Sequence, residues 1–282
     1  MKNLRQYFAE RFPIGLTATH AFATSAMLVG IAALNRPIYE RIWSATAITI
    51  TFFFFMLRMR VTDEFKDRSH DNRNYPNRPV QRGIITTRQL ISIGIIALTT
   101  ELGFAFAAGV STGHPIAIIW HLSILGYSVL THFEFFAKAF LERHFNFYFV
   151  IHQLIFILYP VWVFSIWNTE INPKTLAGAI AFVGFMSAME IVRKYEIRRD
   201  PAGEIVMDTY LSVWKAGAFW AMFAITAIGG WLIHFAGGNL LHTVISLAIC
   251  LMLIAVRQKT DQVRALVALG FILQSVVILI WG

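Results

Sequence analysis

The chain has 282 residues, of which 57% are hydrophobic and 14% are charged, whereas about a quarter of the residues in an average globular protein carry a charge. A water-soluble surface cannot be built from this composition, which excludes a soluble protein. The net charge of +8 predicts no nucleic-acid partner, because a basic rim that faces anionic membrane lipid accounts for it. The sequence therefore indicates an integral membrane protein.

Long uncharged stretches predict the membrane crossings. The 24 residues between Arg11 and Arg36 carry no formal charge, and neither do the 41 residues between Lys215 and Arg257. About 20 apolar residues cross the hydrocarbon, so the second stretch suffices for two crossings. The first is longer than the apolar core of a signal peptide, and we expect it to be retained.

Glycine, proline and charged residues divide the apolar sequence into helices, which predicts an all-α, polytopic membrane fold. The single cysteine, Cys250, excludes a disulfide framework and a thiolate metal site. In chain order, the nine predicted transmembrane helices are 13–35, 41–59, 88–109, 115–136, 144–167, 174–192, 212–236, 239–256 and 263–281.

The distribution of Lys and Arg predicts the orientation. With a cytoplasmic N-terminus, 21 of the 24 basic residues, Lys2 among them, lie on the inside, and only Arg36, Arg41 and Lys174 lie outside. This partition follows the positive-inside rule. It places the loops 60–87 and 193–211 on the cytoplasmic side, and we expect a multi-pass protein of the cell inner membrane.

Nine of the 16 acidic residues fall in two short segments, 58–83 and 190–208. In the first, Asp63, Asp67 and Asp71 are spaced at i, i+4 and i+8, which puts three carboxylates on one face of a continued helix. Such a row repels itself unless a cation such as Mg²⁺ binds between the carboxylates and the oxygens of a diphosphate. The row therefore indicates a metal-bound anion site.

The second segment repeats the spacing with Glu196, Asp200 and Glu204, although Pro201 makes one helix through all three doubtful. Two acidic segments on one side of the membrane could clamp a single anion through shared metals. The alternative is that both segments are solvated, salt-bridged loops, the usual role of charge runs at a membrane surface.

The first segment resembles the first signature of the UbiA superfamily of intramembrane prenyltransferases, Asn-Asp-x-x-Asp-x-x-x-Asp followed by Asn-Arg-Pro and a glycine. The opening Asn-Asp pair is replaced by Asp63-Glu64. The residues that carry the match are Asp67, Asp71, Arg78, Pro79 and Gly83.

The second segment is similar to the second acidic region of that family, with the usual Asp-x-x-x-Asp present only as Glu196-x-x-x-Asp200. The neighbouring residues that contribute to the likeness are Glu190, Arg193, Lys194, Asp208, Thr209 and Tyr210. Both segments follow the helices expected for the family, the second and the sixth. The resemblance thus spans nearly the whole chain, as a single transmembrane domain over 1–282 around a central cavity.

The resemblance implies a Mg²⁺-dependent enzyme that ionises a prenyl diphosphate at the cytoplasmic mouth of the cavity and transfers the prenyl group to an aromatic or other lipophilic acceptor. It implies catalytic roles for Asp67, Asp71, Glu190 and Asp200. The diphosphate would be bound by Arg78, Arg193 and Lys194. The implied metal ligands are Asp63, Glu64, Asp67, Asp71, Glu190, Glu196 and Asp200.

Other functions remain open. An intramembrane terpene cyclase would use the same ionisation chemistry, and a lipid- or quinone-binding protein would use the cavity without turnover. Paired intramembrane histidines could instead ligate haem, although single histidines on helices are usually hydrogen-bonded core residues. Glu101, an acid in an apolar span, is a candidate functional residue or a partner of His121. The histidines in predicted helices are His20, His121, His132, His152 and His234.

Overall fold

The computed structural model describes residues 2–281; Met1, Gly282 and the side chain of Lys2, one of the predicted inside charges, lie outside the described part. Within that part the chain is a bundle of helices with one very short hairpin. In chain order the elements are α1 (Lys2–Arg11), α2 (Ile14–Ala32), α3 (Ile38–Lys66), α4 (Arg68–Asn74), α5 (Thr87–Ser111), α6 (Ile116–His132), η1 (Glu134–Phe136), α7 (Lys138–Arg143), α8 (Phe145–Gln153), α9 (Ile155–Trp167), α10 (Pro173–Arg193), β1 (Arg198–Arg199), β2 (Ile205–Val206), α11 (Tyr210–Trp214), α12 (Ala216–Ala236), α13 (Leu241–Val256) and α14 (Thr260–Trp281).

The predicted all-α, polytopic fold is confirmed. Across residues 2–281, seven helical spans are long and apolar enough to cross a membrane, and the shorter apolar helices α6 and α13 complete the nine predicted segments. The predicted helix 144–167 is interrupted at Leu154, where Ile157 bonds back to Leu154 over three residues. Pro160, three residues further on, cannot donate to the helical ladder.

Local sequence fixes several helix starts. Thr86 and Gln89 form a capping box before α5, with the Thr86 hydroxyl accepting from the Gln89 amide. Asn172 caps α10 by accepting from Lys174 and Thr175, and Pro173 occupies the first helical position, where its missing N–H costs nothing. These caps satisfy amide groups that a helix start leaves without partners.

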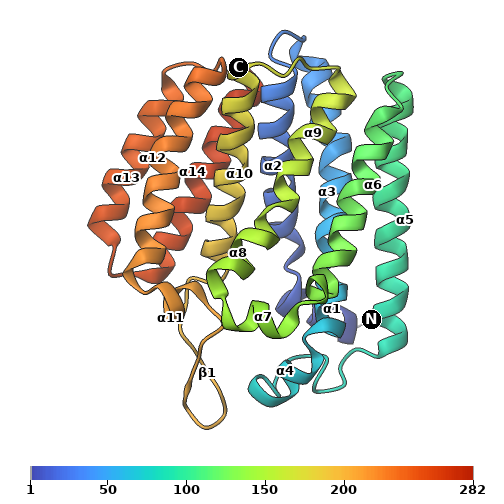
Figure 1. The fold of residues 1–282 in the computed structure, drawn as a ribbon, viewed down its shortest axis with the longest axis vertical. Coiled ribbons are helices and arrows are strands. Elements are labelled where there is room, and N and C mark those ends of the chain that lie inside the picture. Colours follow the sequence, from blue (N-terminus) through green and yellow to red (C-terminus); the bar gives the residue numbers. More distant parts are fainter. Residues whose placement is uncertain (1, 282) are drawn as a thin grey trace.

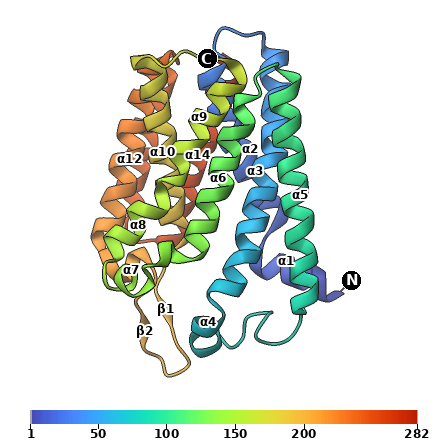
Figure 2. The ribbon, with the colours of Figure 1, turned by 45° about the vertical axis from the view of Figure 1, so that its right-hand side comes forward.

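The long helices run through the bundle from end to end (Figures 1 and 2), and the two chain termini lie at opposite ends. Helices α1, α4, α7 and α11 and the β1–β2 hairpin all gather at the end opposite the C-terminus. Both acidic segments therefore lie at the same end, as the charge distribution predicts. Which side of the membrane this end faces remains a prediction.

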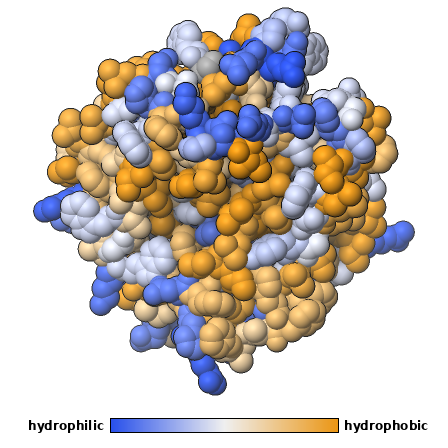
Figure 3. Space-filling model, turned by 45° about the horizontal axis from the view of Figure 1, so that its top comes forward, coloured by the Kyte–Doolittle hydropathy of each residue, from blue (hydrophilic) through white to orange (hydrophobic). Residues whose placement is uncertain are grey.

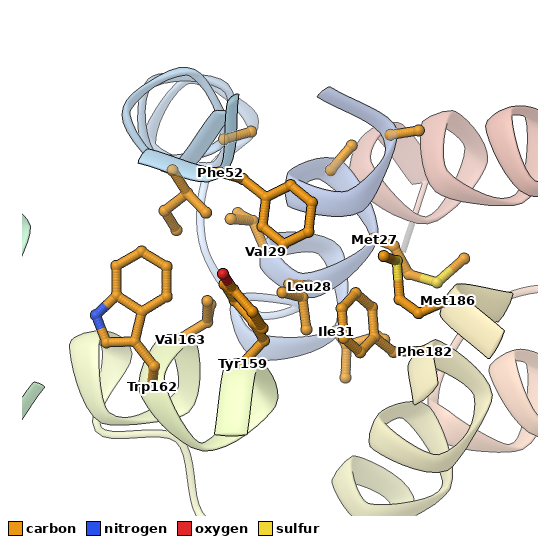
Figure 4. Packing of buried hydrophobic residues seen from close by; sticks show 14 of the residues in the cluster. Met27, Leu28, Val29, Ile31, Phe52, Tyr159, Trp162, Val163, Phe182 and Met186 are labelled. Carbon is orange, nitrogen blue, oxygen red and sulfur yellow. The ribbon is translucent and has the colours of Figure 1, made fainter. Parts of the chain in front are cut away.

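The centre of the bundle is packed with large side chains. Phe52 of α3 contacts Tyr159 of α9, with ring centroids 4.8 Å apart, and Figure 4 shows these rings beside Leu28 and Phe182. Small residues let helices approach: a Cβ added at Gly30 of α2 would lie 2.8 Å from the Ile278 carbonyl carbon of α14. Close backbone packing of this kind stabilises helices in lipid, where water exclusion contributes little.

The outer surface is apolar. Figure 3 shows broad hydrophobic areas between groups of hydrophilic residues. Ile95 and Phe106 on α5 are each 57% exposed, and Leu251 on α13 is 70% exposed. An apolar exterior on helices of spanning length is the arrangement that lipid requires, and the chain is a multi-pass integral membrane protein.

Candidate active site

The first acidic segment forms a helical row of carboxylates. The Asp67 amide donates to the Asp63 carbonyl at 2.9 Å, and the Asp71 amide donates to the Asp67 carbonyl at 2.8 Å. Helical spacing therefore continues from α3 into α4, although the backbone leaves helical geometry at Asp67 itself. The predicted i, i+4, i+8 relationship is confirmed, with a break at its middle member.

Two of the segment's acids are neutralised by arginines. Arg11, at the end of α1, donates to Glu64 at 2.7 Å and lies 3.8 Å from Asp71. Arg78, predicted to bind diphosphate, pairs with Asp71 at 2.5 Å. The sequence reasoning missed Arg11, because nothing in a short basic N-terminal segment indicates which acid it reaches.

The second half of the site lies at the end of α10. Arg193 donates to both carboxylate oxygens of Glu190 at 2.8 Å, and the Tyr210 hydroxyl donates to Glu190 at 3.2 Å. The predicted spacing of this acid and cation by about one helical turn is confirmed. The side chain of Arg193 nevertheless remains 47% exposed and that of Glu190 21% exposed, so a ligand can reach both.

The two helix ends face each other. Asp63 interacts electrostatically with Arg193, and Asp67 with Lys194. We call the residues that these electrostatic interactions connect the charged cluster. It comprises Arg60, Asp63, Lys66, Asp67, Glu190, Arg193 and Lys194.

The charged cluster perturbs its own members. Burial, followed by the neighbouring charge of Asp63, raises the pKa of Asp67, and Asp71 acts in the same direction. Burial and the positive charge of Arg193 lower the pKa of Lys194. Both shifts arise because these half-buried charges lack sufficient compensating charge around them. A cation bound near Asp67 and an anion bound near Lys194 would relieve them.

Lys66 and Glu134 extend the charged cluster. The Lys66 ammonium lies 3.6 Å from Glu134 and 6.0 Å from the Tyr148 ring centroid. Glu134, Phe135 and Phe136 all have positive φ, between 49° and 57°. This left-handed conformation is unfavourable for residues other than glycine. Neither Lys66 nor Glu134 is predicted from the sequence to be a site residue. The only indications in the sequence are that Lys66 lies within the acidic segment and that Glu134 is an isolated acid at the end of a predicted helix.

The loops after α4 and before α11 are joined by polar contacts. The Tyr75 hydroxyl donates to Asp208 at 2.7 Å, and His70 and Arg198 each lie 3.7 Å from the same carboxylate. Burial acts to raise the pKa of Asp208, but the nearby His70 and the hydrogen bond from Tyr75 hold it below its usual value. The nearby Asp208 carboxylate raises the pKa of His70.

The helical spacing suggested for Glu196, Asp200 and Glu204 is wrong. α10 ends at Arg193, and the segment folds into a hairpin in which Arg198 pairs with Val206. Asp200 accepts from the amides of Ala202 and Glu204, each at 2.9 Å. Pro201, which lacks a backbone donor, favours this turn over a continued helix.

The remaining predicted residues of this segment lie at the hairpin and its base. Glu196 pairs with Arg198 and lies 3.8 Å from Arg264. Arg78 and Asp200 line a cavity of about 490 Å³ between the end of α1, the loop 74–79 and the hairpin. A metal-binding role for Glu196 and Asp200 stays a prediction.

Glu101 is held in a separate buried network. Arg58 donates to its two carboxylate oxygens at 2.7 and 3.0 Å and to Ser128 at 2.8 Å. His121 lies 3.3 Å from Glu101, so the expected contact between these two residues is confirmed. The network links α3, α5 and α6. Ionisable residues inside a membrane are usually paired with each other in this way.

Carboxylate oxygens without a partner are available to a divalent cation at this end of the bundle. The Asp67 carboxylate makes no hydrogen bond or ion pair among the described residues, and Glu64 Oε2 and Asp208 Oδ1 are buried without a hydrogen-bond partner. Carboxylate oxygens are the ligands that Mg²⁺ prefers, with substrate oxygens and water completing its shell. No three acidic, His or Cys side chains among residues 2–281 form a complete site, so a ligand would supply the remaining oxygens.

Comparisons with known proteins agree with this architecture. The family model of the UbiA prenyltransferase family matches residues 23–274. A solved structure of digeranylgeranylglyceryl phosphate synthase in membranes has a TM-score of 0.53 and 15% sequence identity, covering 98% of this chain and 99% of that chain. At this identity the likeness concerns the fold. No curated protein matches the chain. The family match, over most of the chain, shows that this protein is a membrane transferase of the UbiA prenyltransferase family.

Proposed function

We propose that the protein uses Mg²⁺ to bind a prenyl diphosphate at the charged cluster and transfers the prenyl group to a lipophilic acceptor. The observation that carries this proposal is the electrostatic interaction of Asp63 with Arg193 and of Asp67 with Lys194, which couples the carboxylate row of α3 to the end of α10. Both helices end here, and their C-terminal carbonyl groups favour a bound cation.

Each half of the cluster has a distinct task in this proposal. Asp63 and Asp67 hold the metal on one side, and Glu190 faces them from the other. Arg193 and Lys194 bind the diphosphate oxygens, aided by Lys66. Bound Mg²⁺ would stabilise the negative charge that develops on the leaving diphosphate. The fixed cations act in the same direction, and because that charge grows as the C–O bond breaks, they favour the transition state over the bound substrate.

Product analysis tests this function. The purified protein is incubated with prenyl diphosphates of different length, with and without aromatic alcohols, and the products are identified by mass spectrometry. We expect Mg²⁺-dependent adducts that disappear when the metal is chelated. Hydrocarbons or alcohols formed equally well without acceptor would instead favour the cyclase alternative. Binding of a prenyl compound without metal dependence or turnover would favour a carrier.

The proposal also places this end of the bundle in the cytoplasm, with the protein in the cell inner membrane. Cysteines introduced at Ser69 and Ala202, after removal of Cys250, provide the test. An impermeant thiol reagent added to intact cells should leave both unlabelled and should label both after the membrane is opened. Labelling of either position in intact cells contradicts this orientation.

A further inference from the structure

His152 lies on α8 beside the charged cluster, and its ring has a defined hydrogen-bonding state. Nδ1 lies 2.8 Å from the backbone carbonyl oxygen of Tyr148. A carbonyl oxygen only accepts hydrogen bonds, so Nδ1 must carry the proton. The neutral ring then has a lone pair on Nε2, and the free nitrogen is an acceptor.

The structure leaves that acceptor without a donor. Nε2 of His152 is buried, and no described residue bonds to it. The ring cannot turn freely, because it stacks on Tyr148 with ring centroids 4.0 Å apart and lies edge-to-face with Phe135 with centroids 6.0 Å apart. Buried polar atoms in native proteins almost always have a partner. A ligand that carries a hydrogen-bond donor would complete this position.

The charges around His152 connect it to the proposed diphosphate site. Lys66 of α3 and Glu190 and Lys194 of α10 are close enough to interact with the ring electrostatically. These three groups belong to the charged cluster. A ligand bound at the charged cluster would therefore lie within electrostatic range of His152, which is carried by α8.

We propose that Nε2 of His152 accepts a hydrogen bond from the hydroxyl group of a protic acceptor, such as an aromatic alcohol, and removes its proton during prenyl transfer. The role in turnover rests on the proposed function. The prenyl C–O bond breaks and its electron pair leaves with the diphosphate. The acceptor forms a new bond to the prenyl carbon, and the hydroxyl proton moves to Nε2. A non-protic acceptor cannot complete this step.

Histidine 144 provides a matched control. His144 Nδ1 lies 2.9 Å from the Phe140 carbonyl, and its ring stacks on Phe140 at 4.2 Å. It therefore repeats the local geometry of His152, but it is exposed. His152→Ala and His144→Ala remove the same chemical group with the same two contacts, a carbonyl and an aromatic ring four residues earlier. His152→Asn is a second variant, which keeps an N–H donor near Tyr148 and lacks the second ring nitrogen.

A binding experiment separates this inference from the proposed function, because it needs neither prenyl diphosphate nor turnover. The probes are 1-naphthol and 1-methoxynaphthalene, which differ in the hydroxyl proton. The parent and His144→Ala should bind naphthol about five- to tenfold more tightly, the effect of one net hydrogen bond. His152→Ala and His152→Asn should bind both probes equally. The proposal would be overturned if the parent bound the two probes equally, or if both His152 variants kept the parent's preference for naphthol.

Turnover provides the second readout. With an aromatic alcohol as acceptor, His152→Ala should lose adduct formation by at least about tenfold, within the range that general base catalysis contributes. Release of diphosphate in the absence of acceptor should change little. Added imidazole should restore part of the adduct formation in His152→Ala and have no effect on His144→Ala. Loss of diphosphate release together with adduct formation, without imidazole rescue, would assign His152 a structural role instead.

Discussion

Tyr75 and Asp208, 133 positions apart in the chain, are joined by a hydrogen bond of 2.7 Å between the phenol and the carboxylate. This bond ties the loop after α4 to the loop before α11. The Tyr75 ring also packs against the Arg78 guanidinium, 3.9 Å from the ring centroid. Through these contacts the two acidic segments hold each other in place at the same end of the bundle.

We predict that Tyr75→Phe loosens this connection. The substitution removes one charge-assisted hydrogen bond, worth about 1.5–3 kcal/mol when well shielded from water. Backbone amides in 195–209 should exchange with deuterium faster, while those of α12 remain unchanged. Tyr39→Phe is the control, because the exposed Tyr39 bonds Glu40 on the same helix. Equal exchange in parent and Tyr75→Phe would contradict a role for the bond in joining the loops.

The same connection should depend on pH through His70. Its pKa is raised by the Asp208 carboxylate 3.7 Å away. The stability that protonated His70 adds to the loop connection is therefore fully present below about pH 6.5, the ordinary pKa of histidine. It is lost as the pH rises through the raised value. The lowered pKa of Asp208 keeps its carboxylate ionised throughout this range. After correction for intrinsic exchange rates, protection of 195–209 should fall between about pH 6 and pH 8. His70→Asn should remove this dependence.

Substitution by Asn should change the melting temperature in opposite directions at Asp67 and Asp71. Burial and neighbouring acids raise the pKa of Asp67, so its charge at neutral pH destabilises the metal-free fold. Asp67→Asn should raise the melting temperature while abolishing Mg²⁺-dependent turnover. Asp71→Asn should lower the melting temperature as well as turnover, because Arg78 loses its acidic partner and Arg11 keeps only Glu64. Near-normal turnover of Asp67→Asn would contradict a metal-binding role and favour the alternative that the acidic segment is a salt-bridged loop.

The pair Glu190 and Arg193 tests the other half of the site. An ordinary exposed ion pair contributes at most about 1 kcal/mol and tolerates substitution. We expect Glu190→Gln or Arg193→Ala to weaken diphosphate binding or turnover at least about tenfold, equivalent to about 1.4 kcal/mol, with little change in melting temperature. Lys138→Ala is the control, since Lys138 and Glu142 form an exposed pair 3.9 Å apart on α7. If both variants bind diphosphate and turn over like the parent, Glu190 and Arg193 form only an ordinary surface ion pair.

The sequence predicted the crossings and the α3 acidic row because both depend on local properties. Apolar runs of spanning length identify the helices, and i, i+4 spacing fixes which side chains share a face. The relation of Glu190 to Arg193 follows from the same rule. The common location of the two acidic segments follows from the number of crossings, which sets the end at which each loop emerges.

The partners of these residues were not predictable in the same way. Arg11 reaches Glu64 from 53 positions away, and Tyr75 reaches Asp208 across the bundle. Such contacts depend on which helices are neighbours, and a single sequence does not disclose this. The hairpin at Asp200 was missed for a different reason. Acid spacing indicated a helix, while Pro201 and Gly203, whose φ is +88°, favour a turn.

The last prediction concerns Arg58 and Glu101. Their side chains are 8% and 0% exposed, and removing one partner would leave the other charge inside the membrane without its main counter-charge. Breaking a buried pair costs about 3–5 kcal/mol, whereas replacing both partners with apolar residues is often neutral. Arg58→Met and Glu101→Leu should therefore each lower the melting temperature sharply, and the double variant should recover most of the loss. If the double variant melts as low as the single variants, the pair does more than balance charge. If it melts like the parent yet cannot transfer a prenyl group, the buried network has a part in turnover as well as in packing.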